Sequence, residues 1–159
     1  MRTIAWTGHR PKDLGSLDYR AFADLMNNRD ETASPYRDLI FVTGGALGID
    51  TYATEWAFVH NIPYHIILPF TTRAMTKFWP ESSRATLRRH LEHAESITVI
   101  GADYYEIQRY QERNIAMVDR ADEVWTYWTG KTHGGTWNCI QYALKEGKPV
   151  FNIRTGAFV

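Results

Sequence analysis

Residues 39–57 read LIFVTGGALGIDTYATEWA, and this stretch decides the fold. It opens with a short apolar run at 39–43 that is typical of a buried strand. Glycines follow at once, and beyond them one helical stripe is formed by Ile49, Ala53, Trp56, Ala57 and His60. A strand that passes through glycines into an amphipathic helix is the repeating unit of a parallel α/β sheet.

The same alternation of strand and helix runs along the rest of the chain. Short runs rich in Ile, Val and Phe predict six strands, at 2–7, 39–43, 63–69, 96–100, 123–128 and 149–153. Amphipathic stretches predict helices at about 17–29, 47–60, 82–93, 105–119 and 135–146. The polar or irregular segments 30–38 and 70–80 are interpreted as connections. The prediction is therefore an α/β fold with a mostly parallel sheet of about six strands, in a single domain over residues 1–159.

Charge and cysteine content narrow the function classes. Lys plus Arg and Asp plus Glu both total 18, so the net charge is zero and argues against direct nucleic-acid binding. No apolar run approaches the roughly 20 residues of a spanning helix, and no signal segment is evident, so we expect a cytoplasmic protein without a membrane partner. Cys139 is the only cysteine, which fits a reducing compartment.

Metal and cofactor chemistry find little support in the sequence. His90 and His93 lie three residues apart, but they lack an evident third ligand, so we predict no metal site. No cofactor is predicted either.

The first candidate loop is TGHRP at 7–11, directly after the first predicted strand. Gly8 permits a tight turn, His9 follows it, and the guanidinium of Arg10 is a planar fork of donors suited to phosphate or carboxylate. The alternative is an ordinary turn with a solvent-facing arginine.

The second candidate loop is TGGALGID at 43–50. The glycines, Gly44, Gly45 and Gly48, leave the N–H groups of a helix start unobstructed, which suits an anion. The loop matches neither the Walker A pattern nor the dinucleotide fingerprint. The alternative is a packing turn in which Asp50 favours the helix dipole.

The third candidate loop is HGGTWN at 133–138, again between a strand and a helix. Gly134 and Gly135 expose backbone donors, and Thr136 adds a hydroxyl. Asn138 lies in the same turn. Since ligands of parallel sheets bind beyond the carboxyl ends of the strands, these three loops are predicted to converge on one crevice.

Taken together, several motifs resemble the SLOG superfamily, most closely its YpsA-like branch, a relative of the lonely guy phosphoribohydrolases and of DprA. They are TGHRP, VTGGALGID followed by TYATEWA, LPF, RNIAMVDRADEVW and GGTWNCIQYALKEGKPV, and they span nearly the whole chain. The resemblance implies a three-layer Rossmann-like fold, a nucleotide-like small-molecule ligand, and homo-oligomers.

Carried over position by position, the resemblance implies a set of ligand contacts: Gly8, Gly44, Gly45, Gly48, Arg113, Asn114, Gly134, Gly135 and Thr136. The chain departs from the phosphoribohydrolase pattern P-G-G-x-G-T-x-x-E, because it reads H-G-G-T-W-N-C-I-Q and has no acid at its end. The acids that remain for catalysis are Asp50, Glu55 and Asp119. Asp50 and Glu55 are five residues apart on one helix and point roughly 140° from each other, so at most one of them can face a substrate.

Three functions follow from these observations. The first is a module that binds a nucleotide or a nucleotide-derived molecule, as sensor or sequestering protein, with Tyr104, Tyr105 or Tyr110 available to stack on a base. The second is an N-glycosidase acting on a nucleotide, in which a carboxylate stabilises oxocarbenium-like charge. The third is an interaction domain of a nucleic-acid-processing assembly.

Overall fold

The computed structural model describes residues 1–28 and 38–159, and it shows a seven-stranded sheet in the order β4-β3-β2-β1-β5-β6-β7. All neighbouring strands from β4 to β6 pair in parallel, and only β6 and β7 are antiparallel. The strands are β1 (Arg2–Gly8), β2 (Leu39–Thr43), β3 (Tyr64–Leu68), β4 (Ser96–Val99), β5 (Glu123–Tyr127), β6 (Val150–Asn152) and β7 (Ala157–Phe158). The predicted α/β class and the six parallel strands are confirmed, and the two-residue β7 was not predicted.

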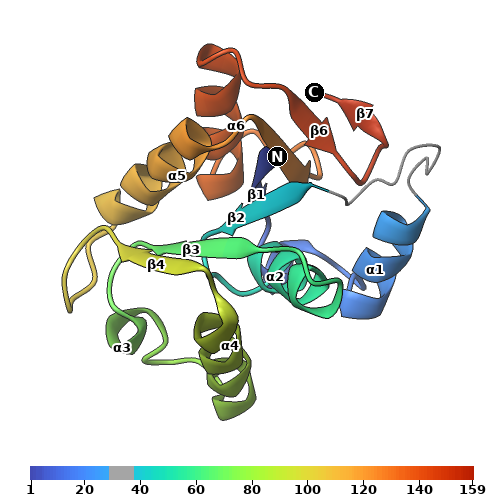
Figure 1. Cartoon of the computed structure of the whole chain (residues 1–159). Coiled ribbons are helices and arrows are strands. Elements are labelled where there is room, and N and C mark those ends of the chain that lie inside the picture. The colour runs from blue at the N-terminus through green and yellow to red at the C-terminus, as the bar shows by residue number, and fades with distance from the viewer. Residues whose placement is uncertain (29–37) are drawn as a thin grey trace.

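Helices cover both faces of the sheet, which makes the fold three-layered and Rossmann-like, as predicted. In Figure 1, α5 and α6 lie above the sheet and α1, α2 and α4 lie below it. The helices are α1 (Tyr19–Asn27), α2 (Ile49–Val59), α3 (Thr72–Met75), α4 (Glu81–His93), α5 (Gln108–Arg120) and α6 (Gly135–Lys145), with a 3₁₀ turn at Pro11–Asp13.

Capping side chains account for two differences from the predicted boundaries. The carboxylate of Asp18 accepts the N–H of Ala21, so α1 begins at Tyr19 and not at 17. Within the predicted connection 70–80, the hydroxyl of Thr71 accepts the N–H of Ala74 and starts the short helix α3. The other predicted connection, 30–38, lies outside the described residues except for Asp38.

The core has two parts, one on each face of the sheet. Below the sheet, the indole of Trp6 on β1 meets Phe22, Phe41 and Trp125 at centroid distances of 5.5, 5.5 and 5.6 Å. Above it, smaller side chains of the strands pack against Val118 and Ile140, and Cys139 is buried among them. Because β1 is buried on both faces, it reads as a continuous apolar run.

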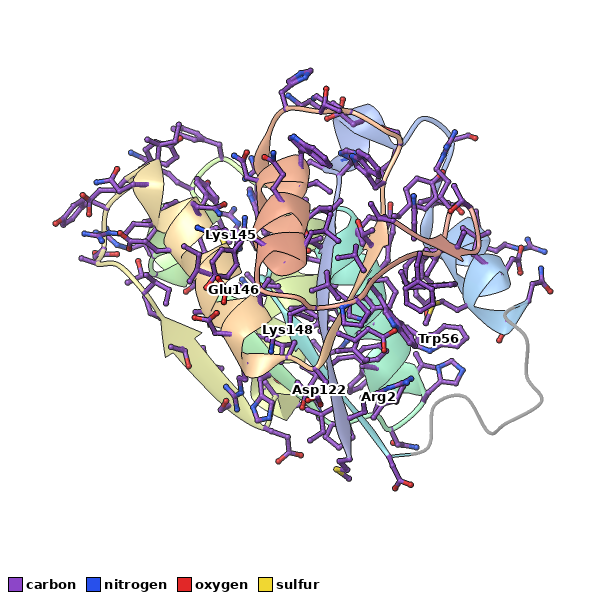
Figure 2. All side chains as sticks on the ribbon, turned by 90° about the horizontal axis from the view of Figure 1, so that it is seen from above. Arg2, Trp56, Asp122, Lys145, Glu146 and Lys148 are labelled. Atoms are coloured by element: carbon purple, nitrogen blue, oxygen red, sulfur yellow. The ribbon has the colours of Figure 1, made fainter. Side chains whose placement is uncertain are left out.

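The chain order places a crevice beside β1. From β1 the strands proceed outward to β4, and the chain then returns to place β5 on the other side of β1. The connections that leave β1 and β5 therefore diverge to opposite faces, and a ligand site is expected at the carboxyl ends of these two strands. In Figure 2, Lys145 and Glu146 mark the C-terminal end of α6, and Gly135 lies at the opposite end of this helix.

Within residues 1–28 and 38–159, none of the helices has the length and apolar character needed to cross a membrane.

Candidate functional site

A cavity of about 540 Å³ opens beyond the carboxyl ends of β1 and β5. It is bounded by the loops after β1, β2 and β5 and by one face of α5. The three glycine-containing loops thus do meet at one place. Most of the residues predicted to contact a ligand line this cavity: Gly8, His9, Arg10, Arg113, Asn114, Gly134, Gly135, Thr136 and Asn138.

The N-terminus of α6 faces the cavity without a side-chain cap. Gly134 is the N-cap residue with a φ of 92°, a conformation that L side chains rarely adopt, and within the described part of the chain no side chain caps this helix. The first N–H groups of a helix have no acceptor within the helix. A Cβ built on Gly134 or Gly135 would meet nothing within 4 Å, and both residues line the cavity, so the start of α6 is not covered by other side chains at these two positions. Such a terminus attracts an anion through both its N–H groups and the helix dipole.

His9 ties the loop after β1 to the loop after β5. Its buried Nε2 accepts the backbone N–H of Thr129 at 3.1 Å, so this nitrogen carries no proton. Burial lowers the pKa of His9, and the imidazole is therefore neutral near pH 7. Nearby, Lys131 and Asp13 form an ion pair at 3.2 Å between the same two loops.

Two arginines bring positive charge to the cavity beside Tyr110. The exposed guanidinium of Arg10 lies 5.2 Å from the Tyr110 ring centroid, and the buried guanidinium of Arg113 lies 5.7 Å from it. Both contacts are within cation–π range. Arg10 lines the cavity, and among the described residues its guanidinium acts on the buried carboxyl of Asp50 only through charge, which opposes the rise that burial causes in the pKa of that carboxyl.

Arg113 and Asn114 on α5 brace the backbones of two glycine loops. Arg113 Nη1 donates to the carbonyl of Gly44 at 2.6 Å, and its Nε donates to Asn114 Oδ1 at 3.2 Å. Asn114 Nδ2 donates in turn to the carbonyl of Gly135 at 3.4 Å. The R-N pair quoted in the sequence therefore couples the loop after β2 to the start of α6.

Asp50 is the buried carboxylate of the cavity. Its Oδ2 accepts the N–H of Ala46 at 3.2 Å. A Cβ on Gly44 would lie 2.8 Å from Asp50 Oδ2 and 2.5 Å from Arg113 Nη1, so carboxylate and guanidinium come together above this glycine. Burial raises the pKa of Asp50, and the charge of Arg113 opposes that rise.

The predicted glycines of the loop after β2 lie behind the cavity lining and serve close packing. A Cβ on Gly45 would lie 2.6 Å from Leu68 Cδ2, and one on Gly48 would lie 2.4 Å from the carbonyl oxygen of His9. Gly44, as described, underlies Arg113. These three positions keep the loop in place, and Ala46 and Asp50 are the residues of this loop that line the cavity.

The other two candidate acids lie away from the cavity. Glu55 binds Arg89 and His90 and so joins α2 to α4. Asp119 is exposed on α5 and accepts the hydroxyl of Tyr142 at 2.6 Å. Of the three acids, only Asp50 lines the cavity, which agrees with the roughly 140° between Asp50 and Glu55 on their helix.

Some lining residues were not predicted as site residues. Asp13, Lys131 and Gln111 contribute polar groups, and Ile107 forms part of the rim. Tyr105 also lines the cavity, and it is one of the three tyrosines that the sequence offered for stacking on a base. Asp13 and Lys131 follow the predicted strands, and their opposite charges in two loops at one sheet edge are the signal that could have indicated them. Among the described residues, no three His, Cys, Asp or Glu side chains gather where they could hold a metal ion.

Comparison with known proteins gives both a family and a fold. The model of the YspA SLOG family matches residues 4–155. Among solved structures, the chain is similar to DNA processing protein A (DprA) from Streptococcus pneumoniae, with 17% identity and a TM-score of 0.67 over 95% of this chain and 50% of that one. It is also similar to DprA from Helicobacter pylori, with 19% identity and a TM-score of 0.64 over 95% of this chain and 64% of that one.

A third solved structure, the structural-genomics target TM1055, has 18% identity and a TM-score of 0.62 over 99% of this chain and 76% of that one. The chain thus spans half the length of the pneumococcal DprA. At these identities the likeness shows the fold alone. The comparison with curated proteins gives no match.

The DprA likeness corrects one prediction. The Helicobacter structure concerns a single-stranded DNA binding mode of a protein with this fold, so the prediction that dismissed direct nucleic-acid binding on the ground of net charge does not hold. The argument from net charge fails because a total of zero describes the whole protein and says nothing of the charge around one site. Around the cavity, Arg10, Lys12, Arg113 and Lys131 outnumber the two carboxylates, Asp13 and Asp50.

Proposed function

The chain belongs to the YspA SLOG family, and from this membership and the cavity beside β1 we propose that it binds a nucleotide or nucleotide-derived small molecule, as a sensor or sequestering module. The phosphate of this ligand lies at the N-terminus of α6, and Arg10 contacts it from the opposite loop.

One observation carries this proposal: the N-terminus of α6, which has no side-chain cap, and the guanidiniums of Arg10 and Arg113 line one cavity. Backbone N–H groups, a helix dipole and arginine forks all favour the same ligand chemistry, a phosphate or carboxylate group. A cavity of about 540 Å³ lies within the range of sites that hold small molecules.

The carboxylates argue for binding over N-glycosidic hydrolysis. Asp13 is paired with Lys131, and Asp50 accepts an N–H and lies near Arg113. Two carboxylates with separate acid and base roles are the usual machinery of glycosidic cleavage. With both acids of the cavity engaged in this way, we propose that hydrolysis of simple nucleotides is slow or absent.

A role in a nucleic-acid-processing assembly is the second candidate, and the DprA fold is the observation that favours it. In that case the cavity receives one nucleotide of a single strand. A short oligothymidylate competes with a free mononucleotide for the cavity only under this second function.

Isothermal calorimetry with AMP and adenosine tests the phosphate contact. Arg10→Ala should weaken AMP binding by about 10-fold or more, because a hydrogen bond to a charged group contributes roughly 1.5–3 kcal/mol. Adenosine binding should change little. Arg20→Ala, which removes an exposed arginine of α1, is the matched control. Equal losses for both ligands, or no AMP binding to the unaltered protein at millimolar concentration, would contradict the proposal.

A further inference from the structure

We propose that Tyr105 is the stacking residue for the flat ring of the ligand and that Asp103 positions it. This inference rests on the proposed function, and it assigns the opposite end of the same ligand. It makes the rim of the cavity specific for a nucleotide over a simple sugar phosphate.

The ring of Tyr105 has no parallel ring stacked on it and is largely exposed to solvent. Tyr105 lines the cavity, yet 62% of it is exposed. Its neighbours Phe70 and Tyr110 meet it at interplanar angles of 58° and 63°, so neither ring is stacked on it. Tyr110, in contrast, already has the guanidiniums of Arg10 and Arg113 near its ring. Tyr105 is therefore the tyrosine of the cavity best placed to stack on a base.

Tyr105 and Ile107 give one part of the cavity lining an apolar character, whereas other parts of the lining are charged. Ile107 lines the same rim and is 71% exposed, so its apolar side chain is accessible to a ligand. Arg10, Arg113 and the terminus of α6 provide the polar part of the lining. This division fits a ligand with an anionic end and a flat, largely apolar end, and a nucleotide has both.

Backbone hydrogen bonds join residues 101–102, shortly before Tyr105, to residues 69–71, which follow β3. The N–H of Gly101 donates to the carbonyl of Pro69 at 3.0 Å, and the N–H of Thr71 donates to the carbonyl of Ala102 at 3.1 Å. The guanidinium of Arg73, on α3, grips both oxygens of Asp103, with Nε lying 3.0 Å from Oδ2 and 3.2 Å from Oδ1.

Asp103 is therefore a positioning residue. The hydroxyl of Thr71 also donates to its carboxylate, and the guanidinium of Arg73 lowers the pKa of Asp103. Arg73 and Asp103 are both well exposed, so their ion pair contributes little to global stability. Its effect is local, because it holds the residues next to Tyr105 before the ligand arrives and reduces the ordering that binding would otherwise require.

Calorimetry with AMP and ribose 5-phosphate tests this inference. Tyr105→Ala should weaken AMP binding by about 10-fold, the lower end of what base–aromatic stacking contributes, and should leave ribose 5-phosphate unaffected. Tyr105→Phe should bind AMP as the unaltered protein does, because stacking needs the ring and not the hydroxyl. Tyr104→Ala is the matched control, since Tyr104 is 60% exposed but does not line the cavity.

A fluorescent analogue separates positioning from stability. Etheno-AMP that stacks on Tyr105 should have its emission changed on binding, and Asp103→Ala should reduce that change several-fold without altering the urea midpoint of unfolding. An unchanged signal in Asp103→Ala would overturn the positioning role.

The outcomes distinguish the two proposals. If AMP binds equally to the unaltered protein and to Tyr105→Ala, the inference on Tyr105 is wrong and the proposed function stands. If Tyr104→Ala loses as much affinity as Tyr105→Ala, or if ribose 5-phosphate is lost together with AMP, the stacking role is also wrong. If the unaltered protein binds neither compound, both proposals fail.

Discussion

Replacing Gly48 by alanine should destabilise the protein and displace the loop that carries Arg10. Gly48 has a φ of 91°, and its Cβ would lie 2.4 Å from the carbonyl oxygen of His9 and 3.0 Å from Arg10 Cα. With a ψ of −128°, this φ lies in a sparsely populated region that costs an L residue about 1–3 kcal/mol. Relief of the overlap adds about 1–3 kcal/mol, because backbone and not a flexible side chain must move. It also endangers the hydrogen bond from the N–H of Ile49 to the carbonyl of His9.

Gly130→Ala isolates the contact from the backbone strain. Gly130 has a φ of 93°, but a Cβ there would meet nothing within 4 Å. Both variants place an L residue at nearly the same positive φ, and we expect the overlap with His9 to make Gly48→Ala the less stable by about 2 kcal/mol. In urea unfolding this appears as a lower midpoint at similar slope, and in thermal unfolding as a Tm about 4–8 °C below that of Gly130→Ala. Equal stability of the two variants would refute the reasoning.

The remaining predictions concern the ligand, catalysis and pH. Gly135→Val should fold, because a Cβ at this position meets nothing within 4 Å. Calorimetry should show that it no longer binds AMP, because the valine side chain would cover N–H donors of α6. Unchanged AMP affinity would refute this prediction. Chromatography should show slow or undetectable release of free base from AMP by the unaltered protein, and Asp50→Asn should not change that rate. Rapid release by the unaltered protein that is lost in Asp50→Asn would favour the hydrolase. Burial lowers the pKa of His9 and of His90 below the value each has in the unfolded chain. Their contribution to the free energy of unfolding is therefore complete above about pH 6.5. It decreases as the pH falls below that value, because the unfolded state then binds more protons than the folded state. Urea unfolding at pH 7.5 and 5.5 should show this loss, and His9→Gln should reduce it; a flat profile would contradict the assignment.

The order of elements could be predicted because strong local patterns coincide with the core. The run at 39–43 is largely buried in the structure, and so are Ile49, Ala53, Trp56 and Ala57 of the predicted stripe, as their periods indicate. The last residue of that stripe, His60, is exposed at the C-cap of α2. Elements without a pattern of their own were missed. The four residues of α3 form because Thr71 caps them, and the two residues of β7 form because Phe151 and Phe158 pair across to β6. The cap of α3 is a local contact and the pairing of β7 with β6 is a tertiary one, and neither has a periodic signal in a sequence.

The site could be predicted as a set of loops, but not as a surface. Parallel strands place their carboxyl ends at one edge, so the convergence of the loops after β1, β2 and β5 follows from topology. Which side of a loop faces the cavity depends on packing across the fold. Gly48 packs against the carbonyl of His9, and Asp50, two residues later, lines the cavity. The segment before Tyr105 is held at the cavity by hydrogen bonds to the residues that follow β3. These hydrogen bonds join residues that are far apart in the sequence.

The most direct test of the proposed ligand site is an amide-resolved NMR titration of the ¹⁵N-labelled protein with AMP and, separately, with adenosine. We predict that the amide signals of Gly135 and Thr136, at the N-terminus of α6, shift with AMP and shift far less with adenosine, because the phosphate accepts from these N–H groups. The amide of Val150 on β6, which lies outside the cavity lining, should stay in place and serves as the internal control. If AMP binds and the amides of Gly135 and Thr136 do not move, the phosphate does not lie at α6, and the central claim is contradicted.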